Sequence, residues 1–390
     1  MDQMTSRATI PTCKDHSSES IPVVAAVLHG PNDLREEIKT LNPPAPFEVQ
    51  IKITDTGVCG TDLHYFQYGR NGDFQLKHPL TLGHEAAGIV TALGSAVTSF
   101  KAGDRVALEV GVSCSECYLC KSGSYNLCPL LRFRGSCKSV PHYDGTLVQK
   151  VNHPAQWCHL VPDGIKDLSL AALAEPLAVS LQGIKRSRLE TATKKDNVLV
   201  LGAGTVGLLT AFAAKKSGAK TVVIADISAD RVSFAVANRI ADKAVLLSNK
   251  KVESTDPLAP AIASAELLKR RAEVPNGFDA VFECTGVQIC VQAAILAAAP
   301  ATKVVLIGMG HPMQELPIGV AGVKEVDIIS VFRYANTYKK ALDMVDQDGD
   351  VLIKMVTHKF PLTYAAKAIE TASLPVDRDG KLVLKVMIGE

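Results

Sequence analysis

The sequence has almost no charge imbalance and no long hydrophobic run. Its 42 basic and 40 acidic residues leave a formal net charge of +2, which gives no electrostatic reason to expect a nucleic-acid or anionic-membrane partner. The longest apolar runs, such as residues 198–201 and 304–307, are as short as single strands and cannot cross a membrane. The N-terminus lacks the apolar core of a secretory signal, and the C-terminal VMIGE carries no lipidation or peroxisomal motif. We therefore expect a cytoplasmic protein.

The composition is that of an ordinary globular chain. Apolar residues make up 47% and charged residues 21% of 390 residues, so large cores can form and one to three domains are expected. A cytoplasmic chain keeps its thiols reduced, so clustered cysteines are expected to bind metal rather than form disulfides. We expect residues 1–20, which are polar, to be a disordered N-terminal arm.

Two kinds of strand pattern divide the chain. In the first half, residues 48–54 alternate strictly, and residues 104–112 and 145–151 are similar, which predicts an antiparallel, barrel-like domain. From about residue 180, continuous apolar runs alternate with helical stretches such as 205–217, which predicts a doubly wound α/β domain. We expect the strands of this second domain at residues 197–201, 221–226, 278–286, 303–310 and 327–334. Near the C-terminus we expect a helix at 364–372 and a strand at 382–388.

A dinucleotide fingerprint opens the second domain. GAGTVG places Gly202, Gly204 and Gly207 between a buried strand and a helix, where glycines let the backbone approach a pyrophosphate at the helix N-terminus. Asp226 ends the next strand at nearly the spacing of the fingerprint. Its carboxylate would bind ribose hydroxyls and repel a 2′-phosphate, which favours NAD over NADP. The alternative is a glycine turn in a sheet that binds no cofactor.

Four cysteines lie close together in CSECYLCKSGSYNLC. Cys114, Cys117, Cys120 and Cys128 can close a tetrahedral thiolate shell, which is the structural form of a zinc site and leaves no open position for catalysis. An iron–sulfur cluster or free thiols are the alternatives.

A second metal site is expected from residues far apart in the sequence. Cys59, His84, Glu85 and Glu175 would supply one thiolate, one imidazole and one or two carboxylates, and three protein ligands plus water is the form of a catalytic zinc site. Asp62 is placed to hold the imidazole in its correct tautomer. Each residue taken singly could be a packing residue.

At this point the sequence resembles the zinc-containing medium-chain dehydrogenases, and within them the polyol (sorbitol, xylitol, arabinitol) dehydrogenases. The resemblance runs from about residue 22 to the end of the chain. The pieces that carry it are CGTDLHYFQYGRNGDF, LGHEAAGIVTALGSAV, GDRVALEVGV, YNLCP, AEPLAV, GAGTVG, FECTG, EVDIISVFRYANTY and VTHKFP.

The resemblance implies a division of the chain and an assembly. A GroES-like antiparallel β-barrel catalytic domain (residues 21–178 and 335–390) would be interrupted by a Rossmann NAD-binding domain (179–334). Two zinc ions per subunit, one catalytic and one structural, NAD⁺ and a homotetramer are implied as well. Residues 130–145 form a longer loop than in the animal enzymes, Thr205 replaces a usual proline, and EVG (109–111) replaces EPG.

The resemblance also implies roles for single residues. Zinc would bind Cys59, His84 and Glu85, with Glu175 as a fourth ligand or one water away. Tyr65, Glu175, Arg333 and Tyr334 would contact the substrate, although each could be a packing or surface residue. The implied cofactor contacts, beside the glycines, are Val206, Asp226, Arg231, Ile307, Gly308, Met309, Val331, Phe332 and Arg333.

The expected reaction is oxidation of a secondary hydroxyl of a polyol to a ketose. Zinc would lower the pKa of that hydroxyl, and the hydride would pass to the nicotinamide. The proton would leave through Glu175 and a water, or from Thr61 through the cofactor ribose to His64, although His64 could simply cap or pack. The alternatives are a zinc alcohol or threonine-type dehydrogenase, and an NAD-binding zinc protein without catalysis.

Overall fold

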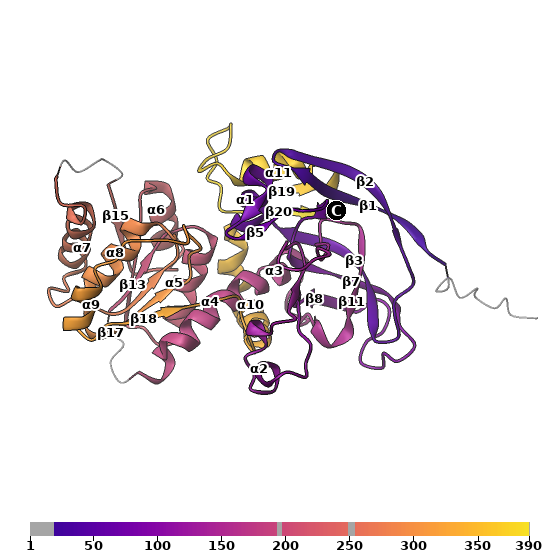
Figure 1. Ribbon diagram of the computed structural model, residues 1–390, viewed down its shortest axis with the longest axis horizontal. Coiled ribbons are helices and arrows are strands. Elements are labelled where there is room, and N and C mark those ends of the chain that lie inside the picture. Colours follow the sequence, from indigo (N-terminus) through magenta and orange to yellow (C-terminus); the bar gives the residue numbers. More distant parts are fainter. Residues whose placement is uncertain (1–18, 193–196, 249–253, 390) are drawn as a thin grey trace, which may run out of the picture.

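The computed structural model describes residues 19–192, 197–248 and 254–389. These residues form two units that lie side by side (Figure 1). One unit is built mainly from the first half of the chain and its last strands, and the other is an α/β unit from the middle. The expected arm, residues 1–20, lies outside the described residues except for Glu19 and Ser20. In the described parts of the chain, no helix is both long and apolar enough to pass through a membrane.

The first unit is a largely antiparallel β-structure, which confirms the prediction. Its main sheet has the order β12-β8-β7-β3-β20-β19, and β11 also pairs with β3. Along β3 the alternating Val49, Ile51 and Ile53 are all buried, as the pattern predicted. The strands of this sheet are β3 (Glu48–Gly57), β7 (Glu85–Leu93), β8 (Arg105–Leu108), β11 (Lys150–Pro154), β12 (Cys158–Leu160), β19 (Val356–Pro361) and β20 (Lys385–Gly389). Smaller sheets hold β1 (Ile21–Gly30), β2 (Asp33–Leu41) and β6 (Leu80–Thr81), the pair β4 (Arg70–Asn71) and β5 (Phe74–Gln75), and the pair β9 (Gly111–Val112) and β10 (Arg132–Phe133).

Three strand predictions in this unit need correction. The strand expected at 145–151 begins only at Lys150, because N–H groups before it donate outside the main sheet: Gly145 N–H to Thr81 O in β6, Leu147 N–H to Leu82 O, and Gln149 N–H to Val24 O in β1. The strand expected at 104–112 is interrupted after Leu108, where the Glu109 N–H donates to Trp157 O. The C-terminal strand expected at 382–388 begins at Lys385.

The second unit is the doubly wound sheet that the buried runs predicted. Its six strands are all parallel, in the order β15-β14-β13-β16-β17-β18. They are β13 (Asn197–Leu201), β14 (Thr221–Asp226), β15 (Lys243–Leu246), β16 (Phe278–Glu283), β17 (Ala298–Leu306) and β18 (Asp327–Ser330). Strands β16, β17 and β18 end three to four residues before the predicted ends, because the chain there leaves the sheet to line a cavity.

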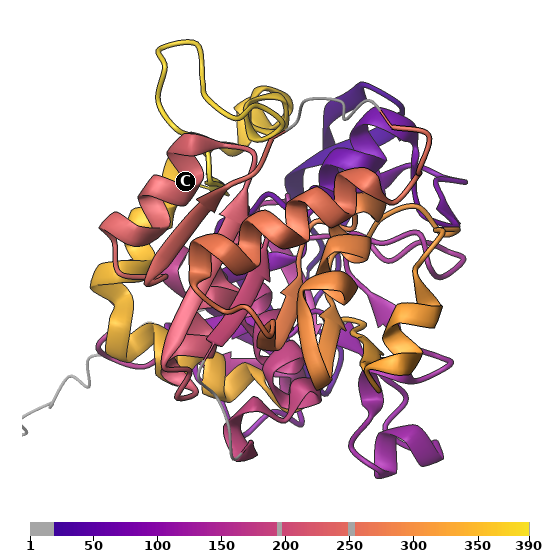
Figure 2. The ribbon, with the colours of Figure 1, turned by 90° about the vertical axis from the view of Figure 1, so that its left-hand side faces the viewer.

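Helices cover this sheet, as Figure 2 shows from its outer side. They are α5 (Thr205–Lys216), α6 (Ala229–Ala237), α7 (Ala259–Ala272), α8 (Gln288–Ala297) and α9 (Ile318–Val323). The other helices are α1 (Gly60–Tyr68), α2 (Tyr118–Lys121), α3 (Leu168–Ala172), α4 (Ala174–Ser187), α10 (Tyr338–Leu352) and α11 (Ala365–Ala372). Helix α4 packs on both α5 and α10. The expected boundary between residues 178 and 179 falls inside α4, so the two units share this helix rather than a flexible linker.

Candidate active site

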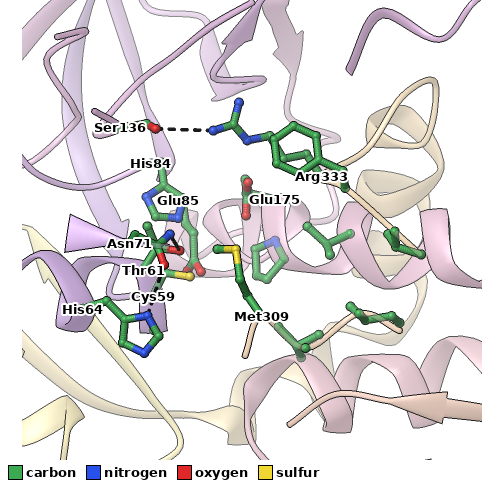
Figure 3. Close-up of a pocket in the computed structure, with 18 of the residues that line it drawn as sticks. Cys59, Thr61, His64, Asn71, His84, Glu85, Ser136, Glu175, Met309 and Arg333 are labelled. Atoms are coloured by element: carbon green, nitrogen blue, oxygen red, sulfur yellow. Dashed lines mark hydrogen bonds between the residues drawn. The ribbon is translucent and has the colours of Figure 1, made fainter. Parts of the chain in front are cut away.

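A cavity of about 400 Å³ lies where the two units meet. Its lining comes from α1, the start of β7, the loop at 133–136, the first turns of α4 and α5, and the loops that follow β16, β17 and β18. Figure 3 shows that polar side chains from the first unit gather on one side of it. A ligand bound here would therefore touch both units.

Three expected zinc ligands meet in this cavity. Cys59 precedes the first residue of α1, and His84 and Glu85 stand at the start of β7. One ligand atom from each lies within 4.8 Å of the other two. Thiolate, imidazole and carboxylate within this distance are the donor set of a three-ligand zinc site, so the residues present fit the metal that the sequence predicted.

Strand register brings these ligands together. Gly57 pairs with Glu85 across β3 and β7, and this pairing places Cys59, two residues on, beside the carboxylate. A Cβ on Gly57 would lie 2.1 Å from Glu85 Oε2, so only glycine leaves room for Glu85 to fold toward the cavity. Two chain segments that are far apart in sequence thus meet because one position carries no side chain.

Buried partners orient the ligands. Asp62 Oδ1 lies 3.6 Å from His84 Nδ1 and also accepts the Gly83 N–H, while Oδ2 accepts the Cys59 N–H. With Nδ1 turned to this carboxylate, the Nε2 lone pair is the one left for a metal. On the other side, Lys385 Nζ donates to Glu85 Oε2 at 2.5 Å and to Val58 O. Sequence reasoning missed Lys385, because only the pairing of β20 with β3 brings it here.

Glu175 lies outside the group of three but lines the same cavity. It stands in the first turn of α4 and is buried. Burial, opposed by the nearby His84 and reinforced by Glu85, raises the pKa of Glu175 to about 7. A carboxyl group with that pKa can exchange a proton at neutral pH.

Thr61 and His64 are joined by a residue that the sequence did not reveal. Asn71 Nδ2 donates to Thr61 Oγ1 at 3.3 Å, and Asn71 Oδ1 lies 3.1 Å from His64 Nδ1. Since the amide oxygen can only accept, the neutral His64 ring carries its proton on Nδ1, and its Nε2 acceptor has no hydrogen-bond partner among the described residues. All three side chains line the cavity (Figure 3).

Arg333 lines the cavity with an unusual backbone. Its φ is +53°, in the left-handed region that few non-glycine residues adopt. The guanidinium lies over the rings of Phe133 and Phe332, at 3.7 and 4.8 Å from their centroids, and Nη2 contacts Ser136 Oγ at 3.4 Å. Nη1 is buried without a partner among the described residues. Burial lowers the pKa of Arg333 to about 10, so it stays charged at neutral pH.

Two expected substrate contacts do not line the cavity. Tyr65 is fully buried, and its hydroxyl accepts the Cys137 N–H at 3.0 Å. Tyr334 is also buried, behind Arg333, and faces a small gap beside Glu109 and Tyr125. Both side chains support the walls of the cavity, and their contact with a substrate stays a prediction. The sequence motifs around Tyr65 and Tyr334 match those of the polyol dehydrogenases, but the direction in which each ring points depends on packing.

The dinucleotide residues lie around the start of α5 and the end of β14, and only some of the expected cofactor contacts line the cavity. Gly202 has φ +96°, and a Cβ on Gly207 would lie 1.9 Å from Gly202 O, so the first turn of α5 can pack closely on β13. Asp226 Oδ2 accepts the Ala203 N–H, and Arg231 passes beside Gly204. Thr205, in place of the usual proline, donates to Leu384 O and ties the loop to the first unit. The expected cofactor contacts that line the cavity itself are Val206, Ile307, Gly308, Met309, Val331, Phe332 and Arg333.

The four clustered cysteines form a separate lobe, residues 114–128, which contains α2 at the edge of the molecule (Figure 1). The Sγ atoms of Cys117 and Cys120 lie 3.5 Å apart, and so do those of Cys114 and Cys128. The Sγ atoms of Cys114 and Cys120 lie 3.9 Å apart. Four sulfurs at about 2.3 Å from one tetrahedral zinc would be roughly 3.8 Å apart. The spacing therefore fits one zinc ion, whereas a multinuclear iron–sulfur cluster holds its sulfurs farther apart. Hydrogen bonds from the backbone lower the pKa of Cys114 to about 6, which favours a thiolate.

Comparison with known proteins agrees with this geometry. Residues 45–163 match the family model of the alcohol dehydrogenase GroES-like domain, and residues 205–347 match the zinc-binding dehydrogenase model. Sorbitol dehydrogenase of Bos taurus is 40% identical over 94% of this chain and 95% of that protein. L-idonate 5-dehydrogenase of Vitis vinifera is 34% identical over 96% of both chains. An alcohol dehydrogenase of Escherichia coli CFT073 in complex with NADH has a TM-score of 0.77 and 28% identity, covering 95% of this chain and 99% of its own.

Proposed function

Because this chain belongs to the zinc-binding medium-chain dehydrogenases, and to their polyol branch, we propose that it oxidises a secondary hydroxyl of a sugar alcohol to a ketose with NAD⁺ as acceptor. The observation that carries the proposal is the shared cavity. Cys59, His84 and Glu85 stand on one side of it, and the cofactor loops at 307–309 and 331–333 stand on the other. The substrate hydroxyl and the nicotinamide ring would therefore lie next to each other there.

Zinc and NAD⁺ would supply the chemistry that the side chains lack. Zinc held by Cys59, His84 and Glu85 would supply Lewis-acid polarisation of the substrate hydroxyl, and NAD⁺ would accept the hydride. Glu175 is proposed to take up the hydroxyl proton, directly or through a water, since its pKa of about 7 suits that task. Glu175 also faces the same space as the three ligands and would contact the substrate.

Thr61 and His64 are proposed to share the proton transfer. Because Asn71 donates to Thr61 Oγ1, the Thr61 hydroxyl proton is free to point to another acceptor in the cavity. Neutral His64 offers an acceptor at Nε2. An amide passes no proton along itself, so the cofactor ribose would have to connect the two side chains. Asn71 would then fix the orientation of the Thr61 and His64 side chains.

The polar lining favours a polyol over a simple alcohol. Arg333 Nη1, Thr61, Asn71 and Ser136 offer donors and acceptors beyond the three ligands. A site built to pair several hydroxyls discriminates strongly against analogues that lack them, because its own polar groups are then left unpaired. A zinc alcohol or threonine-type dehydrogenase on the same fold would need fewer such groups.

We propose NAD rather than NADP as the cofactor. Asp226 stands at the end of β14, next to the glycine loop, and the following Ile227 is not basic. Its carboxylate would bind ribose hydroxyls, and its charge would repel a 2′-phosphate. Asp226→Ser should therefore shift the preference toward NADP, measured as the ratio of kcat/KM values with the two cofactors.

A homotetramer in the cytoplasm is also proposed. Strand β18 is an edge of its sheet, and Met313 and Val323 nearby are 79% and 86% exposed. An open edge beside exposed apolar side chains suits association between copies. Light scattering after size-exclusion chromatography should give four times the chain mass; a monomer would contradict this.

The deciding experiment is a substrate panel with the zinc-loaded chain. NADH formation is followed with sorbitol, xylitol, arabinitol, threonine and ethanol. We expect turnover of at least one polyol with a kcat/KM far above that for ethanol and threonine. Turnover of ethanol or threonine with inert polyols would favour the alternative dehydrogenases. Binding of NADH without turnover of any alcohol would leave a non-catalytic NAD-binding zinc protein.

A further inference from the structure

The cysteine lobe contacts the substrate side of the cavity through three hydrogen bonds. Its partner is the substrate arm, defined here as residues 331–336, which follow β18 and carry Arg333. Asn126 Nδ2 donates to Phe332 O at 2.7 Å. The Asn336 N–H donates to the Tyr125 hydroxyl at 2.7 Å, and Asn336 Nδ2 donates to Gly123 O at 2.7 Å. These bonds join residues that are more than 200 positions apart in the chain.

The bonds hold the arm on both sides of Arg333. Phe332 O lies just before Arg333, and Asn336 lies three residues after it. Both Arg333 and Asn336 have positive φ, +53° and +61°, a conformation that costs free energy in a residue with a side chain. A conformation of this kind persists only where neighbouring groups hold it. Tyr125, Asn126 and Gly123 are the lobe groups that do so here.

The lobe side of these bonds is itself fixed. The Tyr125 hydroxyl donates to Glu109 Oε1 at 2.6 Å, and Glu109 Oε2 lies 2.8 Å from His159 Nε2. Asn126 is only 6% exposed. Tyr125 and Asn126 lie between Cys120 and Cys128, so a metal on the four cysteines would hold the short segment that carries both. The lobe is therefore a rigid support rather than a loose surface loop.

The supported arm sets the position of the guanidinium. The Arg333 guanidinium lies over the rings of both Phe332 and Phe133, so a shift of Phe332 moves one of the two rings that it contacts. Tyr125 and Asn126 also line the small gap behind Arg333 and Tyr334. Other bonds of the arm, from Val331 N–H to Leu306 O and from Ala335 N–H to Gln182 Oε1, lie outside the segment 332–334.

We propose that Tyr125 and Asn126 are positioning residues for Arg333, so that the cysteine lobe sets the affinity of the cavity for a polyol as well as the stability of the fold. The inference rests on the proposed function, because it takes Arg333 as a contact for substrate hydroxyls. Neither residue touches the substrate. Their loss should raise KM for the polyol while the chemistry at the other metal site continues.

The test uses Tyr125→Phe and Asn126→Leu in the zinc-loaded chain. Asn126→Leu removes the hydrogen bond to Phe332 O, and Tyr125→Phe removes the two hydrogen bonds with Asn336 and Glu109, both with little change of shape. We expect KM for the best polyol to rise roughly tenfold, with a smaller change in kcat and in the Kd for NADH. Zinc should stay at two ions per chain. Hydrogen exchange of residues 331–336 should become faster in both variants. Tyr118→Phe is the matched control, since Tyr118 lies on the same lobe but is 76% exposed.

The outcomes separate this inference from the proposed function. An active wild type whose variants keep KM and lose only thermal stability would overturn the positioning role. An equal rise of KM in Tyr118→Phe would overturn it as well, since the effect would then not depend on the bonds to the arm. A wild type that oxidises no polyol would overturn the proposed function, and this inference with it.

Discussion

The cysteine lobe and the cleft triad both gather metal-binding side chains, but the chain builds them in different ways. All four thiols of the lobe come from residues 114–128, and three of them are only partly buried. The cleft triad, Cys59, His84 and Glu85, is collected by strand pairing and, apart from the partly buried Cys59, is nearly inaccessible to solvent. The lobe needs only its own turns, whereas the triad needs β3, β7 and β20 already in register. Four thiolates fill the coordination shell of a metal and suit a structural role. The mixed set of three ligands next to the cofactor loops leaves a position open and suits catalysis.

Loss of a triad ligand should have the largest effect. Cys59→Ser should lower zinc from two ions to one per chain and reduce kcat/KM for the polyol by about a thousandfold or more, since Lewis-acid stabilisation contributes several kcal/mol. Zinc is measured by elemental analysis, and activity by NADH formation. Cys290→Ser, outside both clusters, is the control and should change neither value. A variant with one zinc and full activity would show that the triad is not the catalytic site.

Loss of a lobe ligand should act on stability and on KM, and much less on kcat. Cys128 is fully buried, and Cys128→Ser should also leave one zinc per chain. The free energy of unfolding should fall by about 3–4 kcal/mol where free zinc exceeds its Kd by 100- to 1,000-fold. Thermal unfolding would show this as a melting temperature lower by several degrees, while kcat stays within a few-fold of the wild-type value. An unchanged melting temperature would mean that the lobe needs no metal.

The cleft should also respond to pH in a way that the lobe does not. Burial raises the pKa of Glu175 from 4.5 to about 7, so between these values the folded chain holds a proton that the unfolded chain has released. This contribution to stability is complete below about pH 4.5 and is lost as the pH rises through about 7. In the metal-stripped chain, unfolding by urea should show a loss of up to roughly 3 kcal/mol between about pH 5 and pH 8 from this group. Glu175→Gln should abolish this pH dependence of the free energy of unfolding. Glu266 is exposed and ion-paired, so the control Glu266→Gln should keep it.

The smallest effect is expected at Asp62, which faces the zinc ligand His84. Asp62→Asn keeps the shape of the side chain but removes the charge that faces His84 Nδ1. Zinc affinity of the triad should fall by about 10- to 100-fold, while that of the lobe stays the same. Competition with a chelator of known affinity measures both sites in one titration. Equal weakening at the two sites would show a general loss of folding rather than an effect on one ligand.

Several elements could be predicted because their pattern is local. The strands β13 and β14 lie at the predicted residues, since an apolar run between a glycine turn and a helix allows few other structures. Helices α4 and α10 were not recognised, because their buried faces are formed by contact between the two units. Residues 145–149 were predicted as part of a strand, but several of their N–H groups donate to residues 81–83 and to Val24 of β1, a pairing that the sequence pattern does not reveal.

The same distinction holds for the candidate site. The identity of Cys59, His84 and Glu85 could be read from motifs. The motif around Tyr65, however, gave no sign that the Tyr65 hydroxyl would accept a hydrogen bond from the Cys137 N–H. Asn71 was overlooked because an asparagine in a turn usually has a conformational role. Its amide meets Thr61 and His64 only when the turn at 69–72 folds back over α1.

By itself, the sequence determined the two kinds of domain, the dinucleotide fingerprint and the donor sets for two metal sites. The domain types, the fingerprint and the cysteine lobe depend on residue types at short spacing, which local backbone geometry converts directly into structure, whereas the residue types of the triad could be read from motifs but are brought together by strand register. Only the tertiary structure decided that Lys385 faces Glu85, that Tyr65 and Tyr334 support walls instead of lining the cavity, and that the lobe holds the substrate arm. Those contacts join residues from 72 to 300 positions apart, and their geometry follows from strand register and close packing, which no local pattern contains.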